Sequence, residues 1–271
     1  MEGAGVLRAR VLTAAVAIPL LVWLIVWAPT WIYNIVILAT TFVALREFAE
    51  MGLGGISGAR TTVVAGGMVI AVAMGLGQSG TAISAGIVAC LAGVLLSTLA
   101  TAQDMEKSVS KAAHILLGCL YGGVLLPHFI WLRGIEDGSA WVIFLLACAM
   151  AGDAGGYFGG AAFGSRKLWP TVSPQKTVEG ALVSLFASLA AGVAFNHLVL
   201  GKLGGVEVLC VAGVISVLGQ TGDLLESMIK RAYDAKDSGG LFPGHGGVLD
   251  RTDSLILPVV FVYYYASFIV G

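Results

Sequence analysis

The sequence predicts an all-α protein that crosses a membrane with about nine helices. Hydrophobic residues make up 58% of its 271 positions and the mean hydropathy is +0.92, well above the roughly 45–50% apolar content of soluble domains. Only 11% of the residues are charged. Because charge is so scarce in this chain, the few stretches that concentrate it are the candidates for function.

Nine apolar windows approach the length of about 17–25 residues that a helix needs to cross a bilayer. They lie near residues 11–28, 31–46, 61–78, 81–101, 109–132, 139–160, 180–200, 205–229 and 254–271. The first window lacks an A-x-A-like cleavage site and is followed by further spans, so we expect a retained helix rather than a signal peptide. We expect a single domain over 1–271, in which helices within 11–101 form a bundle and residues 109–271 carry the polar site.

The distribution of Lys and Arg predicts the orientation of these helices. If the N-terminus is cytoplasmic, Arg133 and Lys202 alone fall on the opposite side, which leaves 13 of the 15 basic residues on the cytoplasmic side. Such an excess is the usual mark of cytoplasmic loops. We therefore expect a multi-pass protein of the inner (cytoplasmic) membrane, with the C-terminus outside. A net charge of -1 without a basic tail gives no reason to expect nucleic-acid binding.

The densest polar stretch covers residues 222–253 and combines acids, cations and glycines. Asp223, Glu226 and Lys230 are spaced to share one face near the end of a helix, with Arg231 beside them. The Gly-rich run SGGLFPGHGG follows and exposes backbone N–H groups that can approach an anion. This run is followed by the charged residues Asp250, Arg251 and Asp253. Acids for a divalent ion and cations for phosphate oxygens indicate a polyphosphate site; the alternative is a solvated loop with surface ion pairs.

A second polar stretch covers residues 151–180 and lies on the same predicted membrane face. Asp153 sits within an apolar window, where an acid is a functional candidate, although a carboxylate that only joins two helices is the alternative. Arg166, Lys167 and Lys176 supply cations downstream. We expect Ser173-Pro174 to start a turn and Thr177 to cap a helix that opens at Glu179, where a phosphate would be stabilised. The two stretches can therefore build one shared site.

Histidines and cysteines divide into one functional candidate and several packing residues. His245 lies in the Gly-rich run, where it can donate a hydrogen bond or shuttle a proton near phosphate. Isolated histidines and cysteines in apolar windows are more typical of the core or an interface, and the cysteines lack metal-site spacing. These packing residues are His114, His128, His197, Cys90, Cys119, Cys148 and Cys210.

Both stretches resemble the phosphatidate cytidylyltransferases, also called CDP-diacylglycerol synthases. The resemblance in the later stretch lies in Ser227-Met-Ile-Lys230-Arg231, Lys236-Asp237-Ser-Gly and Pro243-Gly-His245-Gly-Gly-Val-Leu-Asp250-Arg251-Thr-Asp253. In the earlier stretch it lies in Asp153, Tyr157, Phe163-Gly164, Lys167, Pro170, Ser173-Pro174, Lys176-Thr177 and Glu179-Gly180, and Arg10 matches the family's N-terminal start. Ala161 and Gln175 stand where the family often has basic residues, which weakens any phosphate contact at those two positions.

The resemblance implies that CTP and phosphatidic acid react to give CDP-diacylglycerol and pyrophosphate in a magnesium-dependent reaction. It implies that Asp223 and Asp250 bind the metal, with Asp253 and Asp153 as further candidates. The sequence leaves open whether a second, monovalent ion joins magnesium. The residues the resemblance implies for substrate phosphates are Lys167, Ser173, Lys176, Thr177, Lys230, Arg231, Lys236 and Arg251, with His245 near the leaving group. It also implies a homodimer in the lipid bilayer.

Three other classes of protein remain open from the residues alone. A transporter of a charged metabolite would also explain Asp153 and the interrupted, Gly-rich segments. A CDP-alcohol phosphotransferase would act on related lipids, but its pattern of Asp residues around DG and AR dipeptides does not occur here. A structural subunit could bind anionic headgroups through its cations, but Asp250 and Asp253 argue against that role.

Overall fold

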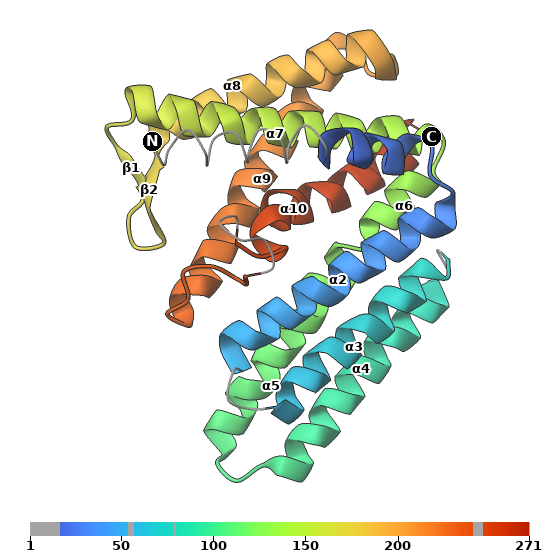
Figure 1. The fold of residues 1–271 in the computed structure, drawn as a ribbon, viewed down its shortest axis with the longest axis vertical. Helices are drawn as coiled ribbons and strands as arrows, with labels where there is room; N and C mark the ends of the chain where they lie inside the picture. The colour runs from blue at the N-terminus through green and yellow to red at the C-terminus, as the bar shows by residue number, and fades with distance from the viewer. Residues whose placement is uncertain (1–16, 54–56, 78–79, 241–245, 271) are drawn as a thin grey trace.

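The computed structural model describes residues 17–53, 57–77, 80–240 and 246–270, and these residues are almost entirely helical (Figure 1). A short apolar helix covers Ala17–Val26. The remaining elements are α2 (Thr30–Leu53), α3 (Ser57–Gly75), α4 (Gly80–Thr101), α5 (Met105–Leu120), the π-helical turn η1 (Tyr121–Leu125), α6 (His128–Gly134), α7 (Gly138–Phe163), β1 (Lys167–Trp169), β2 (Ser173–Thr177), α8 (Val178–Phe195), the π-helical turn η2 (Asn196–Leu200), α9 (Gly205–Ala232), α10 (Leu249–Tyr265) and the π-helical turn η3 (Ala266–Val270).

The predicted fold class is confirmed, because eight helical segments of the described chain are long and apolar enough to cross a membrane. They overlap the last eight of the nine predicted windows. Only Ala17–Val26 of the first window is described as a helix, and residues 11–16 lie outside the described residues. The direction in which the helices cross stays a prediction.

The helices form two groups that meet at α10. In Figure 1, α2, α3, α4 and α5 lie together at one end of the molecule and α7 and α8 lie along the other. The α9 helix packs on α8 and α10, and α10 also contacts α2, α6 and α7. The site therefore draws on both groups, since α10 and the chain before it lie between them.

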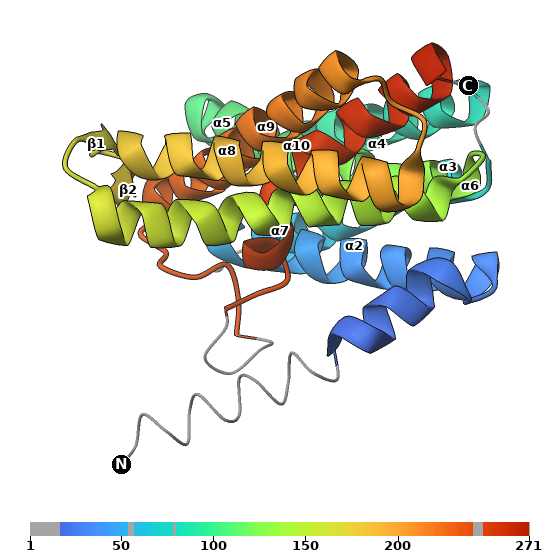
Figure 2. The same ribbon diagram turned by 90° about the horizontal axis from the view of Figure 1, so that it is seen from above.

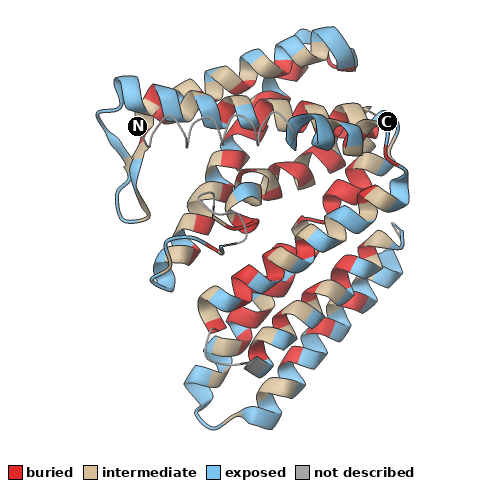
Figure 3. Ribbon diagram, in the orientation of Figure 1, coloured by how far each residue is buried: buried red, intermediate tan, exposed pale blue. Residues whose placement is uncertain are grey.

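Burial follows the contacts between helices, and apolar residues cover much of the outer surface. Leu45, Val63 and Phe144 are fully buried, whereas Leu96 on α4 is 67% exposed. Figure 3 shows the same division, with buried residues along the facing sides of the helices and exposed ones on the outer sides. An apolar outer surface is what a helix bundle surrounded by lipid tails requires.

The segment between α7 and α8 corrects one local prediction. Residues 167–177 form an antiparallel hairpin in which Lys167 lies opposite Thr177 and Trp169 opposite Ser173, at the shared end of α7 and α8 (Figure 2). The turn comes earlier than expected, because the Val172 N–H donates to the carbonyl of Trp169 at 3.2 Å and places Pro170 at the turn position that favours proline. The expected turn start at Ser173-Pro174 was wrong, since both residues belong to β2.

Most of the residues predicted to serve packing are buried. His114 and His128 are buried, and so are three free cysteines, Cys90, Cys119 and Cys148. His197 and Cys210 are exposed, which the sequence did not predict for either residue.

A close backbone contact in the N-terminal group lies between α3 and η1. A Cβ atom added at Gly123 would lie 2.5 Å from the carbonyl oxygen of Gly67 and 2.7 Å from its Cα atom. Backbone atoms cannot move aside as a flexible side chain can. Glycine at Gly123 is therefore what lets the two segments touch, a recurrent device in membrane helix packing.

We predict that Gly123→Ala lowers the stability of the folded protein. The added methyl group overpacks the contact with Gly67 and should cost about 1–3 kcal/mol, measured as an earlier thermal unfolding transition in detergent. Gly93→Ala on α4 is the control, because a Cβ there meets nothing within 4 Å and alanine favours a helix. Equal transitions for the two variants would contradict the packing role of Gly123.

Candidate active site

Lys230 joins two acids from different helices at the centre of the site. Its ammonium nitrogen lies 2.7 Å from Glu226 Oε2, one helical turn earlier on α9, and 2.7 Å from Asp250 Oδ1 at the start of α10. The side chains are only 16%, 1% and 9% exposed, in the order Lys230, Glu226 and Asp250. The prediction that Glu226 and Lys230 share one helix face is thus confirmed. Asp250, twenty residues further along the chain than Lys230, pairs with Lys230 as well.

Asp250 also fixes both ends of the Gly-rich stretch. Its Oδ2 accepts hydrogen bonds from the backbone N–H and hydroxyl of Ser238, each at 2.9 Å, and from the N–H of Gly247 at 2.8 Å. Gly246 has φ +77°, and a Cβ there would lie 2.5 Å from Asp250 Oδ2. Both the positive φ and the close approach to Asp250 require glycine at position 246. One carboxylate therefore holds together residues that lie on either side of residues 241–245.

Glu47 on α2 is a site residue that the sequence analysis missed. Its carboxylate is buried and accepts hydrogen bonds from the N–H groups of Val248 at 2.9 Å and Leu249 at 2.8 Å, and from the hydroxyl of Ser238 at 3.3 Å. The first N–H groups of a helix have no partner within the helix and attract negative charge. Glu47 supplies hydrogen-bond acceptors and a negative charge to the N-terminal end of α10.

The sequence contained a signal for Glu47, but the predicted helix ended too soon. The second apolar window ends at residue 46, so Glu47 lies just beyond it. Helix α2 continues to Leu53 and carries Glu47 within it. An acid on a membrane helix is a functional candidate, and Glu47 lies next to Arg46 in the sequence Leu-Arg-Glu-Phe-Ala.

The second half of the site is a cavity of about 410 Å³ between α7, α8, α9 and the hairpin. Lys176 and Asp223 both line it, and their Nζ and Oδ2 atoms are 2.6 Å apart. Asp153 lines the same cavity and accepts a hydrogen bond from the Ser254 hydroxyl at 3.0 Å. The two polar stretches of the sequence therefore meet, as their common membrane face predicted.

Acidic groups outnumber lysines in this region. Asp223, Glu226 and Asp250 pair with Lys176 and Lys230, and Asp153 and Asp253 lie within reach of the charge of Asp223. Glu226 Oε1 is buried without a hydrogen-bond partner, whereas the Asp223 side chain is 37% exposed. The region therefore holds more carboxyl groups than lysines.

The donor set fits a divalent cation. Magnesium is bound by oxygen ligands, commonly one or two carboxylates completed by water and substrate phosphates. Asp223 presents a carboxylate to the cavity, and Glu226 Oε1 is an oxygen in need of a partner. Both oxygens of Asp250 already have partners within the protein. Across the described residues, no three His, Cys, Asp or Glu side chains are arranged as a complete metal cage. A site completed by substrate oxygens would need no such cage.

The other predicted residues occupy different positions. Thr177 caps α8, accepting from the Gly180 N–H at 3.1 Å as predicted, although α8 opens one residue earlier than expected. Arg231 is exposed in the last turn of α9, Lys236 is exposed beyond the end of that helix, and Lys167 is exposed on β1. The remaining residues are Ser173 on β2, Arg251 exposed on α10, and His245, which lies outside the described residues.

The family model for the cytidylyltransferase family matches residues 8–269, almost the whole chain. The chain belongs to the cytidylyltransferase family. Its cavity and acid cluster are therefore the candidate active site of a cytidylyltransferase-family protein. Lys176 lines the cavity, whereas Lys230 is held between Glu226 and Asp250.

Individual relatives support the same family. The chain is 35% identical over 178 residues to the phosphatidate cytidylyltransferase of Bacillus subtilis, which covers 65% of this chain and 66% of that protein. It is 41% identical over 151 residues to the phosphatidate cytidylyltransferase of Brucella suis, or 55% and 56% of the two chains. The corresponding Staphylococcus haemolyticus protein is 36% identical over 169 residues, or 62% and 64%. The chain thus matches less than two thirds of the length of each relative.

We predict that Glu47→Gln loosens the start of α10. An amide has one acceptor oxygen where the carboxylate has two, so one of the N–H groups of Val248 and Leu249 loses its partner. Hydrogen–deuterium exchange of a peptide that covers residues 246–250 should become at least about tenfold faster, as the loss of a charged hydrogen bond of about 1.5–3 kcal/mol implies. Glu50→Gln is the control on the same helix, because Glu50 is exposed and pairs with Arg46. Equal exchange in both variants would contradict the role given to Glu47.

Proposed function

We propose that this protein transfers the cytidylyl group of CTP to phosphatidic acid, giving CDP-diacylglycerol and pyrophosphate at the membrane surface. The observation that carries the proposal is the cavity in which Lys176 and Asp223 pair beside the cluster of Glu226, Lys230, Asp250 and Asp253. The names of the relatives point to the same substrates. We propose further that the site faces the cytoplasm and that the active form is a homodimer; the excess of basic residues in the predicted cytoplasmic loops supports the first point.

The reaction requires little proton transfer. An oxygen of the phosphatidate phosphomonoester forms a bond to the α-phosphorus of CTP, while the bond from that phosphorus to the bridging oxygen of the β-phosphate breaks and pyrophosphate leaves. The second pKa of a phosphomonoester is about 6, so the attacking oxygen is already ionised near neutral pH. The protein's task is to orient the two phosphates and to stabilise the charge that moves onto pyrophosphate.

We give the two lysines different tasks. Lys176 lines the cavity and is reached from it, so it holds a phosphate of the bound substrates and exchanges its partner Asp223 for phosphate oxygens. Lys230 is buried between Glu226 and Asp250, so it orients these carboxylates and reduces their mutual repulsion. Lys167, Arg231, Lys236 and Arg251 are exposed and attract the triphosphate to the cavity.

We propose that magnesium is bound by Asp223 and Asp250, with Asp253 and Asp153 in support. The bound ion would neutralise phosphate charge and stabilise the leaving pyrophosphate. The number of carboxylates near Lys176 and Lys230 supports this assignment, and one oxygen of Glu226 is buried there without a partner. A monovalent second ion at the same cluster would serve to balance the remaining acids.

The reaction itself is tested by the transfer of radiolabel from CTP into a chloroform-soluble product. We predict that the purified protein transfers label when phosphatidic acid and magnesium are both present and not when either is left out. Label that crosses the membrane of proteoliposomes without chemical conversion would contradict the proposal and would favour a transporter. Well-folded protein without transfer across several divalent ions and detergents would also contradict it.

We predict that Asp223→Asn lowers turnover at least about 100-fold, since charge placed for the transition state has effects of this size. Asp250→Asn should lose turnover as well and should also lower the thermal unfolding temperature, because Asp250 holds Ser238 and Gly247. The comparison separates a loss of chemistry from a loss of structure. Near-normal turnover in both variants would refute the metal assignment.

We predict that Lys176→Gln lowers kcat/KM for CTP roughly 10- to 100-fold, the range that a hydrogen bond to a charged group of about 1.5–3 kcal/mol gives. Lys107→Gln is the matched control, because the Lys107 side chain is 86% exposed and pairs with Asp104 at the start of α5. Equal kinetics for the two variants would show that Lys176 does not contact substrate.

A further inference from the structure

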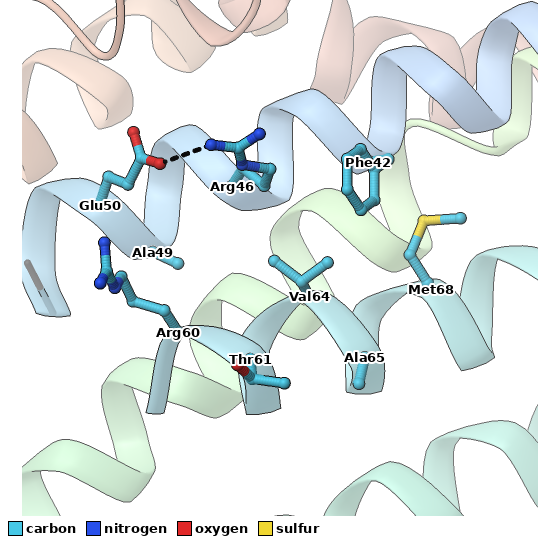
Figure 4. A pocket seen from close by; sticks show the side chains of 9 residues that line it. All are labelled: Phe42, Arg46, Ala49, Glu50, Arg60, Thr61, Val64, Ala65 and Met68. Carbon is cyan, nitrogen blue, oxygen red and sulfur yellow. Dashed lines mark hydrogen bonds and ion pairs between the residues drawn. The ribbon is translucent and has the colours of Figure 1, made fainter. Parts of the chain in front are cut away.

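A second hollow lies between α2 and α3 (Figure 4). Its volume is about 530 Å³. It is lined by Phe42, Arg46, Ala49, Glu50, Arg60, Thr61, Val64, Ala65 and Met68. None of these residues belongs to the site described above, so the hollow needs an explanation of its own.

The hollow is apolar at one end and charged at the other. Phe42, Val64 and Met68 line the apolar end, and Arg46, Glu50 and Arg60 lie at the other end (Figure 4). Helix α2 ends at Leu53 and α3 begins at Ser57, so the two helices run in opposite directions and their charged ends lie together. At 1.5 Å per residue, Arg46 lies about 10 Å from the end of α2 and Arg60 about 5 Å from the start of α3.

Both helices are candidate membrane spans, so lipid is what meets their outer surfaces. Near the end of a span, long basic side chains reach the headgroup level. The apolar end of the hollow then lies at the depth of the acyl chains and the charged end at the depth of the phosphates. The hollow therefore has an apolar part and a charged part, as a single phospholipid molecule has acyl chains and a phosphate headgroup.

The charge of the hollow favours an anionic lipid. Arg46 Nη2 is 3.1 Å from Glu50 Oε1, which leaves the two arginines with one acid between them. In Figure 4, Arg60 extends from α3 toward the Ala49–Glu50 turn of α2. No ion pair joins Arg60 to another side chain of the described residues, and the planar guanidinium group suits bidentate contact with phosphate oxygens.

We propose that this groove binds one anionic phospholipid of the surrounding bilayer. Arg46 and Arg60 hold its phosphate, and one acyl chain lies along Phe42, Val64 and Met68. Glu50 limits the affinity, because it occupies Arg46. The site is separate from the cavity that contains Lys176 and Asp223, so its occupation fastens α2 to α3 and takes no part in phosphoryl chemistry.

Binding is tested by native mass spectrometry of the purified full-length protein. The protein is delipidated and offered equimolar phosphatidylglycerol and phosphatidylcholine with identical acyl chains, and the ratio of the two lipids in the first bound adduct is measured. We expect the wild type to favour phosphatidylglycerol. Arg46→Gln and Arg60→Gln should each reduce that preference about fivefold, which corresponds to the about 1 kcal/mol that one basic side chain contributes near an anionic surface.

Three further variants separate this groove from general surface charge. Glu50→Gln should raise the preference for phosphatidylglycerol, because Arg46 is released. Lys111→Gln is the control for charge on α5 and should leave the ratio unchanged. Ala65→Trp fills the groove from an exposed position and should reduce the first adduct of both lipids, because the acyl chain is displaced.

Several outcomes would overturn the proposal. One is an unchanged ratio in the Arg46→Gln/Arg60→Gln double variant, and another is an equal effect of Lys111→Gln. Retention of the first adduct in Ala65→Trp, together with binding of water-soluble glycerol phosphate, would show a phosphate site without an acyl-chain groove. The measurement does not depend on turnover, so its result is independent of the proposed reaction.

Discussion

The N-terminal end of α10 depends on two carboxylates that come from different parts of the chain. Glu47 reaches it from α2 and accepts the N–H groups of Val248 and Leu249, and Asp250 lies within its first turn and accepts Gly247 and Ser238. In a bundle that lipid surrounds, backbone groups without a partner are costly. The usual polar cap of a helix is thus replaced by a carboxylate from another helix, and this joins the N-terminal group of helices to the catalytic one.

The same arrangement explains why glycines are concentrated next to the acids. A Cβ at Gly239 or Gly247 would lie within 2.6 Å of a Glu47 carboxyl oxygen, and one at Gly246 equally close to Asp250. These glycines make room for the two carboxylates to reach backbone N–H groups directly. The sequence analysis interpreted the glycines as a loop that could approach a substrate anion. The described part shows that Gly239, Gly246 and Gly247 approach the protein's own carboxylates.

Sequence reasoning worked where the signal was local and failed where it needed distant partners. Apolar runs predicted the eight long helices, and helical spacing put Glu226 and Lys230 on one face, because both signals lie within a few turns of helix. The meeting of the two polar stretches needed only that they share a predicted membrane face, but the pairing of Lys176 with Asp223 was not predicted. The role of Glu47 depends on a contact across about two hundred positions, which no spacing rule can show. The turn at Pro170 was missed because Ser173-Pro174 offered an equally good turn signal three residues later.

The charge of the site sets a condition on what it can bind. Five acids, Asp153, Asp223, Glu226, Asp250 and Asp253, lie together with Lys176 and Lys230, and a nucleoside triphosphate would add further negative charge. Lys230 is held between two acids and has little capacity left for a phosphate. Lys176 could turn to a phosphate only by leaving Asp223 without its partner. Under the proposed function, a divalent cation at Asp223 would offset this charge without a further buried side chain. The acids that repel the substrate in the metal-free protein would then be the ones that hold it.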